Sequence, residues 1–397
     1  MVKIDRAEYL PLLMFMLIPF AWVSRGLIHY AQHLFFIISA MVIMGSMLYK
    51  SKPDGIAVKS LSWLIFLLYL SFWQFILFIS VMLFPGRIDF MFTLSLQEFL
   101  FILCGAVVFC AVVKSNLSDK TFYNAICISA LLQVFVGAFQ IFNIDLMGIL
   151  ISPIVPVDYQ LDKGSTSGTL GNNNFLSAWL AISLPFFFRK FWKWFIPIII
   201  AMLFFANTRA GIIAALISGA YFFWVDVLVF FTIGRWRLLK LLAGTIVAWA
   251  LAFIFTLSVK MSSYTNTCSS IKERYDYWWD AIVRTCATPT SFLFGFGPGF
   301  PWKKFGSLHS EYVQMFFNYG YIGIALLFLY IIYLFRNTYS RILTASLISI
   351  ILLISVSYLM RLAPSAFLIL IVCGLIEREI ALNSKGGIKH ETISKTL

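Results

Sequence analysis

Residues Phe316–Phe335, FFNYGYIGIALLFLYIIYLF, form a run with no charged side chain. A helix rises 1.5 Å per residue, so a run of this length is about 30 Å long, which matches the hydrocarbon core of a bilayer. The stretch therefore predicts a membrane-spanning helix.

Similar apolar runs recur along nearly the whole chain of 397 residues, of which 61% are hydrophobic and only 12% are charged. This composition is far from that of a soluble globular protein and leaves no separate soluble domain. We expect an all-α polytopic membrane protein with one transmembrane domain over residues 1–397. The predicted helices, about twelve in number, cover residues 8–24, 30–49, 61–84, 94–113, 121–142, 171–188, 194–208, 210–232, 238–259, 316–335, 342–359 and 362–376. The first run lacks a small-residue cleavage site, so we interpret it as a retained helix.

Lysine and arginine residues gather on one side of this predicted topology. The short loops obey the positive-inside rule when both termini are cytoplasmic. The net charge of +13 is then largely an orientation signal, and it gives no reason to expect a nucleic-acid partner.

Two predicted outer segments are long enough to build a site. The smaller, residues 143–170, leads into SGTLGNNNFLSAWL, where glycines and asparagines precede a helix. Asn172 or a neighbour is expected to cap that helix. The free N–H groups and the amides of Asn172 and Asn174 could also bind a phosphate or sugar hydroxyls.

The larger outer segment, residues 260–315, contains SSIKERYDYWWDAIVRTCATPTSFLFGFGPGF. Apolar residues recur there at helical spacing until Pro289, which predicts an amphipathic helix on the outer membrane surface. GFGPGF is expected to be a loop. Cys268 and Cys286 would face an oxidising compartment in a bacterium, so a disulfide and two free thiols both remain open.

Charged residues near the predicted outer surface indicate where chemistry could occur. Arg209, in NTRAG, lies at a break between two apolar runs, where its guanidinium needs a partner, water or an anionic ligand. Arg274 and Arg284 lie on the amphipathic stretch, and His309 follows the glycine loop. Arginines suit a diphosphate, and a neutral histidine can accept a proton from a sugar hydroxyl.

The other histidines, His29, His33 and His390, provide no ligand cluster for His309, so we expect metal-free chemistry without a cofactor. Arg361 precedes Pro364 at a predicted outer turn. An outer cluster that includes Arg361 would fit a one-sided enzyme site, whereas charges spread through the depth of the membrane would fit transport.

His309 and Ser310, nine further residues, Gly320, two residues and Gly323 give H-S-x9-G-x-x-G. This pattern resembles the fingerprint of bacterial O-antigen ligases. The similarity extends over most of the chain, through TLGNNNFLSAWLAISLP, NTRAG, ERYDYWWDA and FGFGPGF. The family has twelve membrane helices and a large periplasmic loop, which agrees with the helix count above.

The resemblance implies transfer of a glycan from undecaprenyl diphosphate to lipid A-core, with inversion at the anomeric carbon. The reaction would take place on the periplasmic face of the inner membrane of a bacterium, without metal or nucleoside triphosphate. Arg209 and Arg274 would hold the diphosphate, and His309 would help to deprotonate the acceptor hydroxyl. Arg284 joins this set by proximity alone, and Ser310 through its place in the motif. Gly320 and Gly323 are expected to permit close helix packing.

Related functions share the donor and differ in the acceptor. O-antigen polymerases typically carry arginine motifs in two large periplasmic loops, but residues 143–170 contain no arginine. Arg284 and Gly295 do fit an R-x10-G polymerase pattern. Protein oligosaccharyltransferases often add a C-terminal soluble region, and this chain ends soon after its last predicted helix. A transporter of an anionic lipid is the alternative from another class.

Overall fold

The computed structural model describes residues 105–106, 108–113, 115, 117–144, 146, 149, 166–170, 172–230, 264–297, 308, 310–356 and 363–385. Within these ranges the chain is mostly helical and contains no strand, which confirms the predicted helical class. The helices predicted from residues 8, 30, 61 and 238 lie outside the described ranges, as does most of the one predicted from residue 94.

Eleven labelled helical segments follow one another along the described chain. They are α5 (Asp119–Ile141), α7 (Asn173–Ser183), the 3₁₀ segments η3 (Leu184–Phe188) and η4 (Trp192–Phe195), α8 (Ile196–Phe205), α9 (Arg209–Phe230), α11 (Tyr264–Cys286), α12 (Pro289–Phe294), α13 (Glu311–Asn337), α14 (Arg341–Val356) and α15 (Ala363–Lys385). Among the described helices, α5 and α13 are long and apolar enough to cross a membrane.

Helix boundaries differ from the predicted ones where polar caps or proline intervene. α13 begins five residues earlier than predicted because Ser310 caps it, and its backbone breaks at Gly320. α7 is shorter than the predicted helix 171–188, since Pro185 converts its last turn into the 3₁₀ segment η3. α15 continues to Lys385, beyond the last apolar residues.

The centre of the molecule is a contact between α7, α9 and α14. Gly211 of α9 lies so close to Ser177 of α7 that a Cβ at Gly211 would collide with the serine side chain. Ser349 of α14 donates to Ala181 O at 3.2 Å and to Ala214 O at 3.4 Å. These contacts advance in the same direction along α7 and α9, so the two helices run parallel.

Pro185 explains one of these hydrogen bonds. Proline has no N–H, so the carbonyl of Ala181, four residues earlier, lacks its usual helical donor. The Ser349 hydroxyl supplies a donor to that carbonyl, and Ser346 donates to Ile182 O at 2.7 Å. Serine side chains of α14 therefore satisfy the end of α7 inside a buried apolar core.

The packing of α14 shows that α7, α9 and α13 begin on the same side of the molecule. It follows α13 after a short turn and runs back antiparallel to it, and Tyr312 in the first turn of α13 donates to Ile351 O at 3.2 Å. Because α7 and α9 run opposite to α14, they begin on the side of the molecule where α13 begins.

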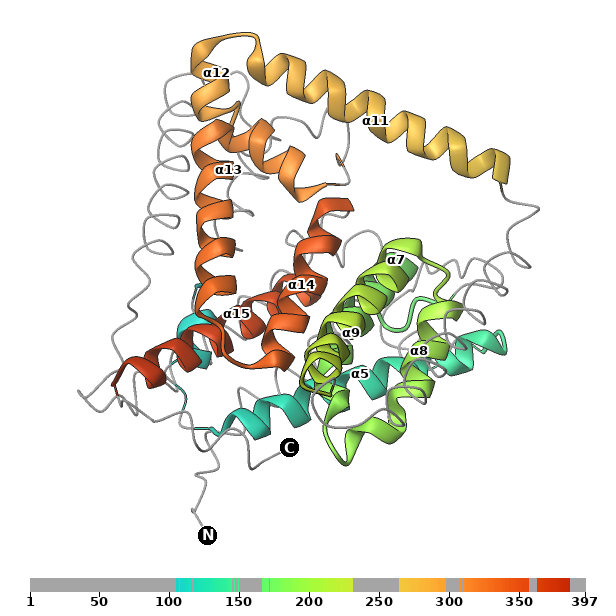
Figure 1. Ribbon diagram of the computed structural model, residues 1–397. Helices are drawn as coiled ribbons and strands as arrows, with labels where there is room; N and C mark the ends of the chain where they lie inside the picture. Colours follow the sequence, from blue (N-terminus) through green and yellow to red (C-terminus); the bar gives the residue numbers. More distant parts are fainter. Residues whose placement is uncertain are drawn as a thin grey trace.

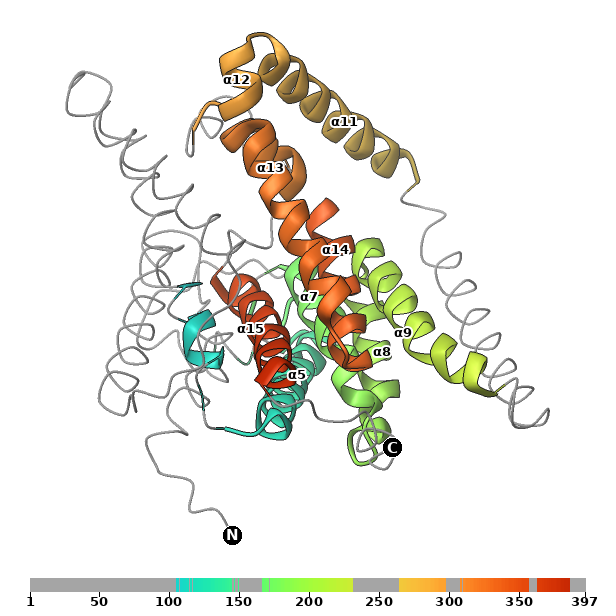
Figure 2. The same cartoon turned by 60° about the vertical axis from the view of Figure 1, so that its left-hand side comes forward.

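The predicted amphipathic helix is α11, and it lies with α12 across the top of the molecule in both views (Figures 1 and 2). The sequence predicted that Pro289 ends this helix, and that prediction is wrong. α11 ends at Cys286, and Pro289 instead opens α12, which is capped by Thr288 Oγ1 accepting from Ser291 N at 3.1 Å.

A disulfide between Cys268 and Cys286 is excluded by the helix that contains both. They are eighteen positions apart on the continuous α11, which corresponds to about 27 Å along the axis. A disulfide needs Cα atoms within about 7 Å. Cys286 is a free, exposed thiol.

Candidate functional site

The beginnings of α7 and α9 lie side by side because these helices are parallel and touch near their first residues, at Ser177 and Gly211. Small side chains permit the approach, since Gly211 has no Cβ and Ser177 is buried against it. Parallel helices add their dipoles, so the paired N-termini carry partial positive charge from both. The pair is therefore suited to bind an anion.

Three sequence-predicted residues occupy these helix starts. Asn172 caps α7, as predicted, and its Oδ1 accepts from Asn174 N at 2.8 Å, while Asn174 itself is exposed. Arg209 is the first residue of α9 and is also exposed. Within the described part of the chain, Arg209 makes no hydrogen bond or ion pair. The structure thus brings Asn172, Asn174 and Arg209 to neighbouring helix ends.

The buried loop of residues 166–170, which precedes α7, is held in place by two glutamines of α5. Gln140 Oε1 accepts from Ser167 N and Gly168 N, both at 2.9 Å, and its Nε2 donates to Gly168 O at 2.8 Å. Gln133 Nε2 donates to Thr169 Oγ1 at 2.7 Å, and its Oε1 accepts from Thr169 N at 3.0 Å. Two glutamines of α5 therefore replace the backbone partners that this loop lacks.

The sequence prediction did not include these glutamines. Gln133 and Gln140 are seven residues apart, on one face of an otherwise apolar helix, and both are buried. A polar pair at this spacing inside an apolar helix is the signal that could have identified them.

A second part of the site forms where α12 meets the break in α13. Gly320 has φ of +63° and Gly295 has φ of +74°, and the two backbones touch. Just before the break, two carbonyls of α13 accept hydrogen bonds from the chain that follows α12. Phe296 N donates to Phe317 O at 2.9 Å, and Gly297 N donates to Asn318 O at 2.8 Å.

This junction accounts for Gly295 and Gly320, one glycine from each of the two glycine motifs. GFGPGF supplies the strap at residues 295–297, and the first glycine of G-x-x-G is the break point itself. Gly320 therefore serves close backbone packing, as predicted, although the partner is the α12 strap.

α11 contacts the chain immediately before His309. Trp278 Nε1 donates a hydrogen bond to the carbonyl oxygen of Leu308. The Leu308 side chain is buried with Ala281 and Phe317 in a small cluster. On the other side, Ser310 is buried and caps α13. His309 and Arg361 lie outside the described residues, so their predicted places in the site are not described.

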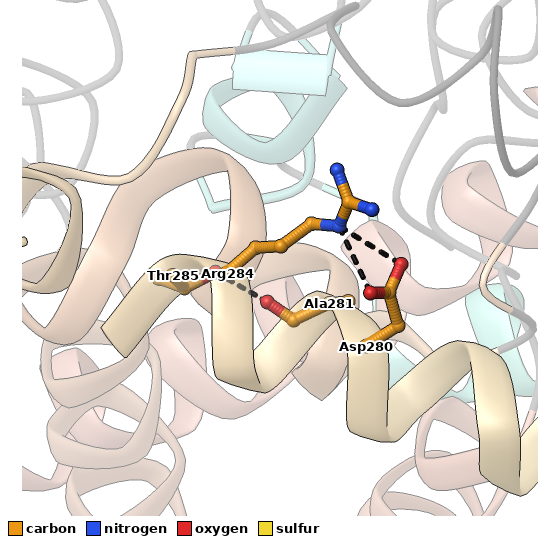
Figure 3. Close-up of polar contacts among 4 residues, drawn as sticks. All are labelled: Asp280, Ala281, Arg284 and Thr285. Atoms are coloured by element: carbon orange, nitrogen blue, oxygen red, sulfur yellow. Dashed lines mark hydrogen bonds and ion pairs between the residues drawn. The ribbon is translucent and has the colours of Figure 1, made fainter. Parts of the chain in front are cut away.

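The two remaining arginines lie on α11 in different surroundings. Arg274 is partly buried and, within the described ranges, makes no hydrogen bond or ion pair. Arg284 Nε faces both carboxylate oxygens of Asp280, at 3.0 Å and 2.9 Å (Figure 3). The charge of Arg284 is therefore partly neutralised by Asp280 of the same helix. At 3.6 residues per turn, Arg274 and Arg284 are about 80° apart around the helix.

A metal site would need several His, Cys, Asp or Glu side chains close together. Among the described residues no group of three His, Cys, Asp or Glu side chains converges. The polar groups gathered at this end of the molecule are arginines, amides, hydroxyls and helix N-termini, which are donors suited to an anion.

Comparison with protein-family models gives no match for this chain, and comparison with curated protein sequences gives none either.

Proposed function

We propose that this protein is a polytopic inner-membrane enzyme of the O-antigen ligase type. It moves a glycan from undecaprenyl diphosphate to lipid A-core on the periplasmic side of a bacterial inner membrane. About twelve transmembrane helices carry the site, both termini are cytoplasmic, and residues 260–315 form the large periplasmic loop. The apolar α5 and α13 are consistent with this topology.

The observation that carries the proposal is the parallel pairing of α7 and α9. Their adjacent N-termini hold Arg209 and the Asn172–Asn174 turn on the side where α13 begins. This end of the bundle combines helix dipoles with a guanidinium that has no protein partner among the described residues. A diphosphate leaving group needs such a site, because negative charge grows on it as the glycosidic bond breaks.

In the proposed reaction, Arg209 and Arg274 bind the diphosphate of the donor. The acceptor hydroxyl loses its proton to His309 and attacks the anomeric carbon, and the bond from that carbon to the diphosphate oxygen breaks. The electron pair passes to the diphosphate, where the arginines stabilise it. Ser310 contributes by starting α13 next to His309.

The polymerase alternative loses one of its supports. The R-x10-G match ends at Gly295, whose positive φ and contact with Gly320 give it a structural role in the α12 strap. Its first residue, Arg284, is paired with Asp280. The ligase therefore remains the better proposal.

The test is a transfer assay with purified protein in lipid nanodiscs. A lipid-linked glycan is offered with lipid A-core as acceptor, in the presence and absence of EDTA. We expect glycan on lipid A-core, with no effect of EDTA and loss of product in a His309→Ala variant. Arg209→Ala should lower kcat by about 100-fold or more. Arg209→Lys should keep part of the activity, because lysine retains the charge but cannot form two parallel bonds.

The matched control is Arg336→Ala, which removes an exposed arginine at the other end of α13 and should behave like wild type. Longer glycans on the carrier lipid would identify a polymerase instead, and glycan on a protein acceptor would identify an oligosaccharyltransferase. Movement of the anionic lipid across the bilayer without any transfer would favour the transporter.

A further inference from the structure

We propose that Trp278 is a positioning residue that fixes the chain carrying His309 relative to Arg274. This inference rests on the proposed function for its kinetic consequence. Its structural part, the anchoring of residue 308, stands on the contacts described above.

The first step is the hydrogen bond between Trp278 and Leu308. An indole N–H is only a donor, and a buried carbonyl without a donor is costly, so each group satisfies the other. The Leu308 side chain is 1% exposed and packs with Ala281 and Phe317. Both the carbonyl and the side chain of Leu308 are thus held by α11 and α13.

The second step is the anchor on the other side of His309. Ser310 is buried, its Oγ accepts from Val313 N at 3.5 Å, and its carbonyl accepts from Gln314 N at 3.0 Å. In the sequence, His309 therefore follows one anchored residue, Leu308, and precedes another, Ser310.

The third step is the position of Arg274 on the same helix. Arg274 lies four residues before Trp278, so the two share a face of α11 and lie one turn apart. α11 therefore carries Arg274, the proposed diphosphate-binding arginine, and through Trp278 it also binds Leu308, the residue before the proposed base. Catalysis is sensitive to this spacing, since a displacement of about 1 Å can cost about 100-fold in rate.

Trp279 provides a natural comparison. It is the same residue type, next in sequence, yet its side chain is 59% exposed and lies about 100° further round the helix. Replacing Trp278 by phenylalanine removes the N–H and keeps a large aromatic ring. Replacing Trp279 in the same way makes a chemically matched change away from Leu308.

The experiment compares Trp278→Phe, Trp279→Phe and wild type in nanodiscs. Hydrogen exchange of peptides covering Leu308–Val313 measures the anchoring directly. The carbethoxylation rate of His309, followed by mass spectrometry, measures its surroundings, and His29, His33 and His390 in the same molecules serve as internal references. The transfer assay with lipid-linked glycan and lipid A-core supplies kcat and KM.

We expect Trp278→Phe to speed exchange in this segment by about tenfold, as the loss of one hydrogen bond implies. The carbethoxylation rate of His309 should change while the reference histidines do not. The kcat should fall about 10- to 100-fold with a KM for the lipid-linked glycan within about twofold of wild type. Trp279→Phe should match wild type in every measurement.

Equal exchange and equal His309 reactivity in both variants would overturn the positioning role. A parallel fall of activity in both variants would also overturn it, since the effect would then not depend on Leu308. If wild type transfers no glycan but Trp278→Phe alone alters exchange and His309 reactivity, the positioning role stands and the proposed reaction fails.

Discussion

Gly295 and Gly320 touch through their backbones, so that neither position has space for a side chain. A Cβ at Gly295 would lie 2.5 Å from Asn318 C and 2.6 Å from Gly320 N, and one at Gly320 would collide with the backbone of Leu293. Both residues also have positive φ. The break in α13 and the strap that satisfies it therefore depend on two residues far apart in sequence.

Gly295→Ala and Gly320→Ala should each lower the free energy of unfolding by at least ~2 kcal/mol, because strain and collision add. The double variant should cost less than the sum, since either change breaks the same contact. Thermal unfolding in nanodiscs measures this. Gly219→Ala is the control, because its Cβ would approach only Phe188 Cζ, at 3.9 Å. Unchanged stability in Gly320→Ala would contradict the contact.

Gly211→Ala should separate the starts of α7 and α9, because the new methyl group meets Ser177. We expect a loss of about 1–3 kcal/mol of stability from overpacking. We also expect a weaker apparent affinity for the lipid-linked donor. Adding Ser177→Gly should restore part of both. If the double variant is no better than Gly211→Ala alone, the loss arises elsewhere.

Gln140→Leu should release the loop at residues 166–170, since it leaves the buried N–H groups of Ser167 and Gly168 without an acceptor. The expected cost is about 1–3 kcal/mol for each unsatisfied group. Hydrogen exchange of these two amides should rise steeply. Phe135→Leu, an exposed position on the same helix, is the control. Protection equal to wild type in Gln140→Leu would show that these bonds do not hold the loop.

Arg274→Ala and Arg284→Ala should differ sharply in the transfer assay. Arg274→Ala should reduce kcat by about 100-fold or more if it stabilises the leaving diphosphate. Arg284 is paired with Asp280 and partly exposed, and such pairs contribute about 0–1 kcal/mol to stability, so Arg284→Ala should retain activity within about threefold. A larger loss in Arg284→Ala than in Arg274→Ala would reverse the two roles.

Several features could be predicted from sequence because they are local. The asparagine cap of α7 and the amphipathic α11 follow from residue type and periodicity over a few turns. Arg209 at a helix start follows from a charge at a break between apolar runs. The same local reasoning placed a helix end at Pro289, but it could not tell a proline that ends one helix from a proline that begins the next.

Long-range contacts could not be predicted in this way. Hydropathy indicates that Ser177 and Gly211 are in apolar helices, but not that those helices are parallel neighbours. The contact of Trp278 with Leu308 was equally hidden, since interfacial tryptophans are common and Trp279 has the same sequence context. The disulfide question was settled only by the continuity of α11, because spacing in sequence does not give distance in space.

The serines of α14 also bear on the order in which the chain is assembled. Ser346 and its partner Ile182 are 164 residues apart, so the end of α7 is synthesised long before its donors exist. Because Pro185 has no N–H to donate to the Ala181 carbonyl, that carbonyl gains the donor Ser349 only when α14 packs against α7. The end of α7 therefore completes its hydrogen bonds only after α14 has been synthesised and has packed against it.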